Sequence, residues 1–295
     1  MNDRELLERR SALEAAAYAG TSTRGGQGRW LLLHGDTGSG RTALLKEIVR
    51  RESTAGRMLR LEASAVPAES GFAFSLLRGL CPTDGRIPFD EVSPGEEQRL
   101  FHHLTQRLSD TAATRPLLLA VDDVHLADAP SLRWLGYLSH RLSGLPALLV
   151  LTACTDPTAP RPGTALLPGA GLSPATGDAV PLPPLGPVSV ARLLDRQRIP
   201  HGTRALADIA GIGRPALVRA MARGSGPDGT PAPLGAEYRA AFARWLGCPS
   251  TPHRRTIALA LAVALDHAAR RRPAADAPRA DPSPSGDGAP TPTGS

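Results

Sequence analysis

The sequence predicts an α/β fold in which helices cover both faces of a parallel sheet. Continuous apolar runs of strand length recur along the chain, at residues 30–33, 117–121 and 148–151. Segments with apolar residues at helical spacing separate these runs. Unbroken apolar strands indicate burial on both faces, which is typical of parallel sheets. A glycine-rich loop also joins the first run to a helical segment, which places the most informative turn of the chain at the end of a strand.

The N-terminal segment is predicted to be a helix followed by a linker. Leu6, Leu7, Leu13 and Ala16 recur at helical spacing. Residues 20–28 are rich in Gly, Ser and Thr, and therefore predict a linker into the first strand. We therefore assign residues 1–28 to a helix and linker, and residues 29–185 to the first domain.

The loop after the first strand has the pattern of a phosphate-binding loop. Its glycines let successive backbone N–H groups face one concavity, and the next helix adds the positive end of its dipole. Strand, loop and helix stand in the order of a P-loop NTPase. The predicted nucleotide-binding residues are Gly35, Asp36, Thr37, Gly38, Ser39, Gly40, Arg41 and Thr42.

Position 41 departs from the P-loop pattern, which has lysine there. Arginine is longer and planar, so this exchange is not conservative at a tight site. Codon drift in a chain that has nearly abandoned lysine would explain Arg41, and so would loss of hydrolysis with binding retained. Both explanations predict weak turnover. The next residue, Thr42, is predicted to reach a nucleotide-bound magnesium ion with its hydroxyl.

Two acids follow the apolar run at residues 117–121. We expect Asp122 to lie beside the magnesium ion and Asp123, the predicted catalytic residue, to polarise an attacking water. The alternative is an ordinary strand end with a solvated turn. The phosphate loop and the acid pair occur in the right order in one chain, which favours the nucleotide-binding interpretation.

The remaining elements follow from the same patterns. Residues 58–63 alternate as a short strand, and Ser93 is the predicted N-cap of a helix that buries Leu100, Phe101, Leu104 and Leu108. Pro130 opens another helix, and residues 156–178 read as a long loop. Further helices are predicted at 189–198, 203–210, 215–223, 236–246 and 256–270. Residues 273–295 are rich in proline and predicted to be disordered.

The segment from Asp122 to Asp128 carries a family resemblance. With Ser131-Leu132 and Trp134-Leu135, it resembles the D-D-L-H-W-A-D…S-L segment of the large ATP-binding LuxR-type regulators, in the STAND branch of AAA-like P-loop ATPases. Leu6–Arg9 and Gly213–Val218 resemble the L-x-x-R-E and G-N-P elements of that family. The resemblance extends from about Leu6 to Met221. Leu126 replaces the family Trp, and Arg214 replaces its Asn.

The resemblance implies a nucleotide-dependent switch that binds ATP or ADP with Mg²⁺, hydrolyses ATP weakly and is linked to transcription. It also implies a helical lid and a partial winged-helix-like region, which we assign to residues 186–272. The alternative is a pseudo-ATPase that serves as a protein-interaction module. A protein partner or self-association is expected in either case. Nothing after Ala236 has room for both a repeat array and a DNA-binding domain, so specific DNA binding is not expected from this chain.

Composition limits the other classes of function. The formal net charge is +6, and Lys46 is the only lysine among 34 lysine and arginine residues. We interpret most arginines as solvated substitutes for lysine; Arg254–Arg255 and Arg270–Arg272 are the only candidates for nucleic-acid contact. The cysteines are too few and too scattered for a disulfide scaffold or zinc site. A signal segment is not visible, and the apolar runs are too short to span a membrane, so a cytoplasmic protein is expected.

Overall fold

A computed structural model describes residues 6–54, 58–81, 89, 92, 95–155, 171–196 and 213–223. Within these residues the chain forms one five-stranded sheet, with the strand order β2-β3-β4-β1-β5 and every neighbouring pair parallel. The strands are β1 (Arg29–Gly35), β2 (Leu59–Ser64), β3 (Leu117–Asp122), β4 (Ala147–Cys154) and β5 (Gly177–Pro181). The predicted parallel α/β P-loop fold is therefore confirmed.

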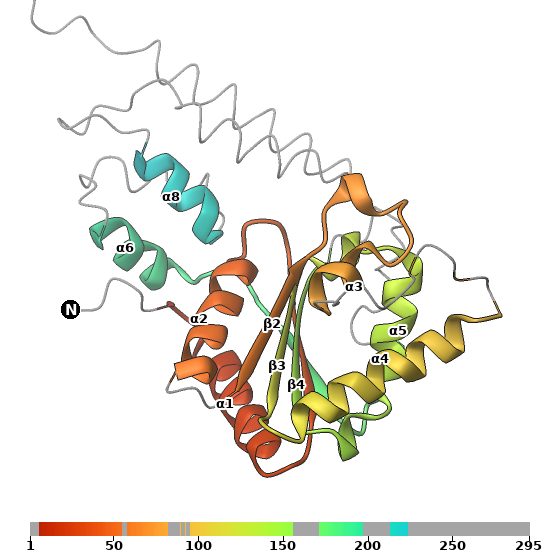
Figure 1. Ribbon diagram of the computed structural model, residues 1–295. Helices are drawn as coiled ribbons and strands as arrows, with labels where there is room; N and C mark the ends of the chain where they lie inside the picture. Colours follow the sequence, from red (N-terminus) through yellow and green to blue (C-terminus); the bar gives the residue numbers. More distant parts are fainter. Residues whose placement is uncertain are drawn as a thin grey trace, which may run out of the picture.

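Helices cover both faces of this sheet (Figure 1). On one face lie α1 (Arg10–Arg24) and α2 (Arg41–Ser53), and on the other lie α3 (Ser75–Leu80), α4 (Glu97–Ala112) and α5 (Ala129–Ser139). Alternate residues of one strand enter different cores: Leu31 and Leu33 pack with α1 and α2, while Leu32 packs on the opposite side. Full burial of such a side chain stabilises the fold by about 1.5–3 kcal/mol. The two cores therefore explain the continuous apolar runs of the three central strands β1, β3 and β4.

The two remaining described helices lie next to the loop that follows β1. After β5 the chain forms α6 (Pro187–Arg196), and α8 (Pro215–Arg223) packs beside it, above the start of α2 (Figure 1). Single 3₁₀ turns lie at Pro67–Glu69, Val124–Leu126 and Leu142–Gly144. The predicted helices at 203–210, 236–246 and 256–270, the tail at 273–295 and the greater part of the proposed winged-helix-like region lie outside the described residues.

The N-terminal helix differs from its predicted extent. It begins at Arg10, after the two leucines that were expected to be part of it, and continues to Arg24 through half of the predicted linker. Gly20 lies inside the helix and faces the carboxylate of Glu52, where an added Cβ would collide with Oε2. Arg24 binds the same carboxylate at 2.5 Å. A glycine needed for close packing was thus misread as a linker residue.

Two other boundaries were also wrong. β5 begins at Gly177, inside the segment 156–178 that was predicted to be a loop; residues 156–170 of that loop lie outside the described residues. This strand is short, lies at the sheet edge and ends in a proline, so it lacks the apolar run that marks the other strands. The helix expected to begin after Ser93 starts at Glu97. Its predicted buried residues Leu100, Phe101, Leu104 and Leu108 are confirmed.

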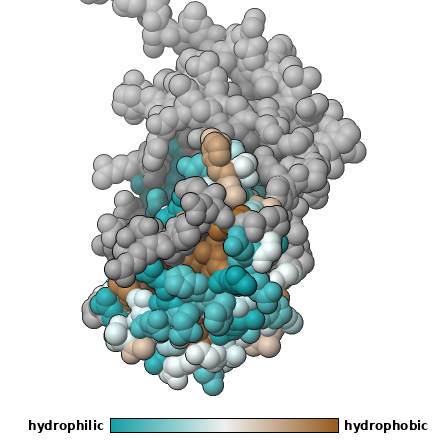
Figure 2. Space-filling model, turned by 45° about the vertical axis from the view of Figure 1, so that its right-hand side comes forward, coloured by the Kyte–Doolittle hydropathy of each residue, from teal (hydrophilic) through white to brown (hydrophobic). Residues whose placement is uncertain are grey.

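The surface is mixed in polarity. In the view of Figure 2, hydrophilic residues cover most of the lower part of the molecule, and apolar residues show in the centre of this face. The large apolar side chains that are exposed among the described residues are scattered: Tyr18, Val66, Phe72 and Val188. None of the helices within the described ranges is long and apolar enough to cross a membrane.

Candidate functional site

The glycine-rich loop connects the end of β1 to the first turn of α2. Gly38 and Gly40 have φ angles of 84° and 93°, in the left-handed region that favours glycine. Gly40 is the N-cap of α2, so Arg41 and Thr42 occupy the first two helical positions. The N–H groups at such a helix start have no intrahelical partners and form an anion-binding site together with the loop. The predicted strand, loop and helix are therefore in place, while the binding roles of residues 35–42 remain predictions.

The acid pair lies at the end of β3, two strands away from β1. The strand between them, β4, supplies Thr152, whose buried hydroxyl donates to Asp122 Oδ1 at 2.5 Å and accepts from the backbone N–H of Asp123 at 2.8 Å. Asp123 has a φ of 50°, so the chain turns sharply between the two acids. Thr152 thus fixes both neighbours at once. The apolar run predicted as this strand ended at residue 151, one residue before the threonine, and the sequence did not indicate the contacts of Thr152.

Asp123 meets the loop through Arg41. The guanidinium Nη2 of Arg41 lies 3.3 Å from Asp123 Oδ1. The side chain of Arg41 is only 11% exposed, and its Nη1 atom is buried without a hydrogen-bond partner among the described residues. The structure therefore brings together the predicted catalytic acid and the residue that replaces lysine.

Two further arginines hold the loop through its backbone carbonyl groups. Arg214, just before α8, donates to the carbonyl oxygen of Thr37 at 2.8 Å and forms an ion pair with Asp36. Arg9, just before α1, donates to the carbonyl oxygens of Ser39 and Pro183. Both arginines are at most 5% exposed. Arg9 and Arg214 are therefore exceptions to the interpretation of most arginines as solvated, and their contacts with the loop were missed by sequence reasoning.

Helix α8, in the segment predicted to be a lid, also contacts the loop through its backbone. The N–H of Ala216 donates to the carbonyl of Gly38 at 3.2 Å, and an added Cβ at Gly38 would lie 3.3 Å from the Cβ of Ala216. Nearby, the N–H of Leu185 donates to the carbonyl of Gly213. The start of α8 thus lies against the glycine-rich loop, which couples the position of α8 to the loop conformation.

The remaining acid of the signature segment has a structural role. Asp128 is buried and caps α5 by accepting from the N–H of Ser131. The same carboxylate accepts from the N–H groups of Phe74 and Leu76, at the start of α3. His125 is buried as well, and its Nδ1 accepts from the N–H of Cys154 at the end of β4. The family-like segment therefore combines site residues with residues that anchor neighbouring elements.

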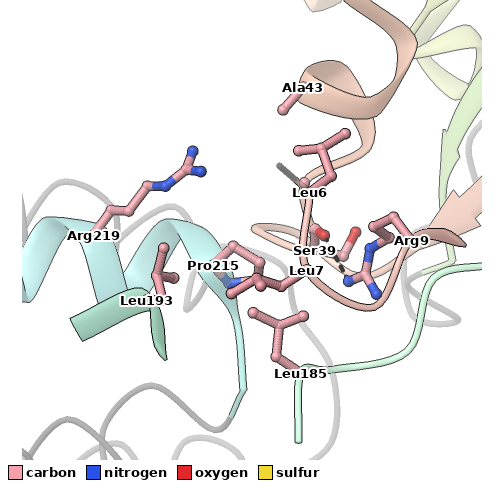
Figure 3. A pocket seen from close by; sticks show the side chains of 10 residues that line it. Leu6, Leu7, Arg9, Ser39, Ala43, Leu185, Leu193, Pro215 and Arg219 are labelled. Carbon is pink, nitrogen blue, oxygen red and sulfur yellow. Dashed lines mark hydrogen bonds between the residues drawn. The ribbon is translucent and has the colours of Figure 1, made fainter. Parts of the chain in front are cut away.

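Two cavities flank the loop. Figure 3 shows the first, where Leu7, Leu185 and Pro215 approach from three segments and Arg9 reaches Ser39; it also includes Ala43 and Arg219. The second has a volume of about 360 Å³ and lies over the ends of β1, β4 and β5. Prolines 181, 183 and 184 line it together with His34 and Arg214. Burial lowers the pKa of His34, which favours the neutral form of its imidazole.

The donor set of the loop and acids fits a magnesium ion. Mg²⁺ prefers oxygen ligands and takes one or two from the protein, with the others from phosphates and water. Asp122 keeps its second carboxylate oxygen beyond the Thr152 contact, and Thr42 offers a hydroxyl at the second position of α2. When bound, the ion would neutralise charge on the phosphates. The assignment of Thr42 and Asp122 as its ligands remains a prediction.

Comparisons with known proteins agree with this geometry. Residues 5–151 match the family model described as AAA ATPase domain. Among curated proteins, none matches the chain in sequence. The fold is similar to that of Cdc6p from Pyrobaculum aerophilum, with 15% identity and a TM-score of 0.52, over 81% of this chain and 68% of that chain. That similarity supports the fold alone.

Two more distant structures have TM-scores below 0.5. The ORC1 protein of Aeropyrum pernix, solved in complex with DNA, is 17% identical with a TM-score of 0.47, over 92% of this chain and 70% of that chain. A STAND protein of Pyrococcus horikoshii with a tetratricopeptide repeat sensor is 13% identical with a TM-score of 0.42. This chain covers 32% of that protein, and 81% of this chain is matched.

Proposed function

We propose that the chain binds ATP and ADP with Mg²⁺ at its Gly35–Thr42 loop and acts as a nucleotide-dependent regulatory switch, from the premise that residues 5–151 match the AAA ATPase domain. The observation that carries the proposal is the loop itself. Gly38 and Gly40 hold left-handed conformations between β1 and α2, and the first two residues of that helix follow directly. Such a loop presents backbone N–H groups to phosphates.

The contacts between the proposed lid helix α8 and the loop support the proposed role as a switch. Arg214 and the first turn of α8 contact the carbonyl groups of the loop, so a phosphate that reshapes the loop also acts on the lid. A ligand shifts a conformational equilibrium only by its different affinity for the two conformations. In this chain that difference in affinity would arise at Arg214, which joins the loop to α8.

Hydrolysis is proposed to be weak. A P-loop lysine is a compact charge that sits against the terminal phosphates, whereas the planar guanidinium of Arg41 is already paired with Asp123. The proposed water-polarising acid therefore shares its charge with the residue that should stabilise the phosphates. Both functions are compromised by one ion pair.

The same ion pair favours a second candidate function. If Arg41 and Asp123 remain paired in the presence of nucleotide, the domain would serve as a pseudo-ATPase module for protein interaction. A link to transcription, a protein partner and self-association are proposed only from the resemblance to LuxR-type regulators. The Arg254–Arg255 and Arg270–Arg272 clusters, the only candidates for DNA contact, lie outside the described residues.

Calorimetric titration with ADP and with ATP, each with and without Mg²⁺, tests nucleotide binding, and a phosphate-release assay on the same samples tests hydrolysis. Gly40→Val should abolish binding, because a β-branched residue is strongly disfavoured at a φ of 93°. Asp122→Ala should weaken the dependence on Mg²⁺. Gly71→Val is the matched control, since no atom lies within 4 Å of the added Cβ. Absence of binding at millimolar nucleotide would refute the proposed nucleotide-dependent switch and would favour the pseudo-ATPase interaction module.

A further inference from the structure

We propose that Asp123 competes with nucleotide phosphates for the guanidinium of Arg41, so that this carboxylate regulates the affinity of the loop. The inference rests on the proposed nucleotide binding and adds a regulatory role for the acid. In this view the carboxylate occupies the place of a phosphate oxygen beside Arg41. Nucleotide binding must break the ion pair before Arg41 can bind the phosphates.

The geometry of Arg41 shows an ion pair that is only half formed. A single contact of 3.3 Å joins Nη2 to Asp123 Oδ1, in place of the two parallel hydrogen bonds of a forked arginine–carboxylate pair. The other terminal nitrogen, Nη1, is buried and without a hydrogen-bond partner in the part of the chain that the structure describes. An unsatisfied buried donor is costly, and several phosphate oxygens would satisfy both nitrogens. Arg41 is therefore better matched to a phosphate than to Asp123.

Asp123 is the fixed member of the pair. Its N–H donates to Thr152, and its carbonyl oxygen accepts from the N–H of Leu126 at 2.8 Å. These contacts hold the backbone at a φ of 50°. Arg41 has a long side chain that begins at the first residue of α2. Exchange between the two anions therefore requires movement of the arginine side chain rather than of the strand end.

The exchange of Arg41 from Asp123 to the phosphates has an electrostatic cost that lowers the affinity for nucleotide. When Arg41 turns to the phosphates, Asp123 loses its cationic neighbour and remains as a negative charge close to a negative ligand. Like charges in a partly buried site repel each other. Removing the charge of Asp123 should therefore strengthen nucleotide binding, although the same substitution would remove the proposed catalytic acid.

The test measures ADP binding by calorimetry in the presence of EDTA, because ADP excludes effects of hydrolysis and EDTA excludes metal binding by the acids. We expect Asp123→Asn to tighten ADP binding by about two- to fivefold, the upper part of the range for one partly exposed ion pair. Asparagine tolerates a left-handed backbone, so the fold should be retained. Asp123→Gly is a second variant that fits the same φ without a charge, and thermal unfolding checks both proteins.

A double-mutant cycle with Arg41→Ala identifies the cause. In the Arg41→Ala background, Asp123→Asn should tighten ADP binding by less than half as much as in wild type, because Asp123 then has no guanidinium for which to compete. Asp122→Asn is the matched control for removing one negative charge at the same strand end, and it should tighten binding less than Asp123→Asn. An equal effect of Asp123→Asn and Asp122→Asn, or a gain in the Arg41→Ala background as large as the gain in wild type, would overturn the inference; a smaller remaining gain is the direct repulsion between Asp123 and the ligand. Absence of ADP binding in every variant would instead refute nucleotide binding itself.

Discussion

At the scale of single residues, Arg41 determines how much chemistry the site can perform. Its guanidinium has five donors in a rigid plane, whereas the lysine of the P-loop pattern has three donors on a point charge. Here one terminal nitrogen of the guanidinium, Nη2, lies 3.3 Å from Asp123 Oδ1. The residue that should stabilise charge on the transferred phosphoryl group is thus directed at the acid that should orient water.

Arg41→Lys should raise the rate of ATP hydrolysis by about a hundredfold, because a misplaced charge in a phosphoryl-transfer site costs a few kcal/mol. A single-turnover assay with saturating ATP measures the chemical step directly. Adding Asp123→Asn to Arg41→Lys should abolish the gain, since Asp123 is the proposed water-polarising acid. Efficient hydrolysis by the wild-type protein, unchanged by Arg41→Lys, would mean that the loop has adapted to arginine.

At the scale of elements, one carboxylate joins two helices. Asp128 accepts from the N–H of Ser131 at the start of α5 and from the N–H groups of Phe74 and Leu76 at the start of α3. These helices lie more than 50 residues apart in sequence. Their relative position on this face of the sheet therefore depends on a buried acid that takes no part in the proposed chemistry.

Asp128→Ala should lower the free energy of unfolding by about 2–4 kcal/mol, the sum of a lost helix cap and unsatisfied buried N–H groups. Urea unfolding measured by circular dichroism gives this value. Asp110→Ala, at an exposed position of α4, is the control and should change the stability by less than about 0.5 kcal/mol. Equal stability of both variants would show that the cap at Asp128 is unimportant.

A second prediction at this scale concerns the contact between lid and loop. Arg214→Ala leaves the carbonyl of Thr37 without its donor and removes the ion-pair partner of Asp36. Amide hydrogen exchange in residues 36–40 should accelerate by about tenfold, which corresponds to a loss of roughly 1.4 kcal/mol in local stability. Arg133→Ala is the control, because that arginine is half exposed and contacts Glu97 far from the loop. Unchanged exchange at the loop would show that the arginine does not stabilise it.

The sequence predicted the elements whose signal is local. Apolar runs marked β1, β3 and β4, and the glycines of the phosphate loop marked the turn before α2. Contacts between distant residues were not predictable, because nothing in the segment around Arg214 indicates that its partner is Asp36, 178 residues earlier. The strand β5 was missed for a different reason, since it is a short edge strand that ends at Pro181.

At the scale of the whole molecule, the interpretation of most arginines as solvated was only partly correct. Many arginines do lie on solvated faces and form exposed pairs, such as Arg10 with Glu14 and Arg133 with Glu97. Arg9 and Arg214 instead are buried and donate hydrogen bonds to backbone carbonyl groups of the phosphate loop. At these two positions a planar fork with several donors is needed, so lysine would not substitute for it.

The net charge of +6 predicts weak, non-specific contact with DNA. Fluorescence anisotropy with a random duplex should show affinity that falls by roughly tenfold between about 50 and 200 mM salt, as expected if about two phosphates are neutralised. Replacing Arg270–Arg272 by glutamine should remove most of this binding. A sequence-specific footprint at physiological salt would reveal a DNA-reading element that sequence analysis missed.

The positions of Arg9 and Arg214 in the sequence determine the order in which their contacts with the phosphate loop can form during synthesis on the ribosome. Arg9 is translated before the loop, while Arg214 emerges 178 residues after Asp36. At about 5–20 residues per second, this delay is roughly 10–35 s. During synthesis the nascent domain therefore passes through a stage in which its sheet can close while the loop is held from one side only. A nucleotide encountered at that stage meets a loop that still lacks its lid.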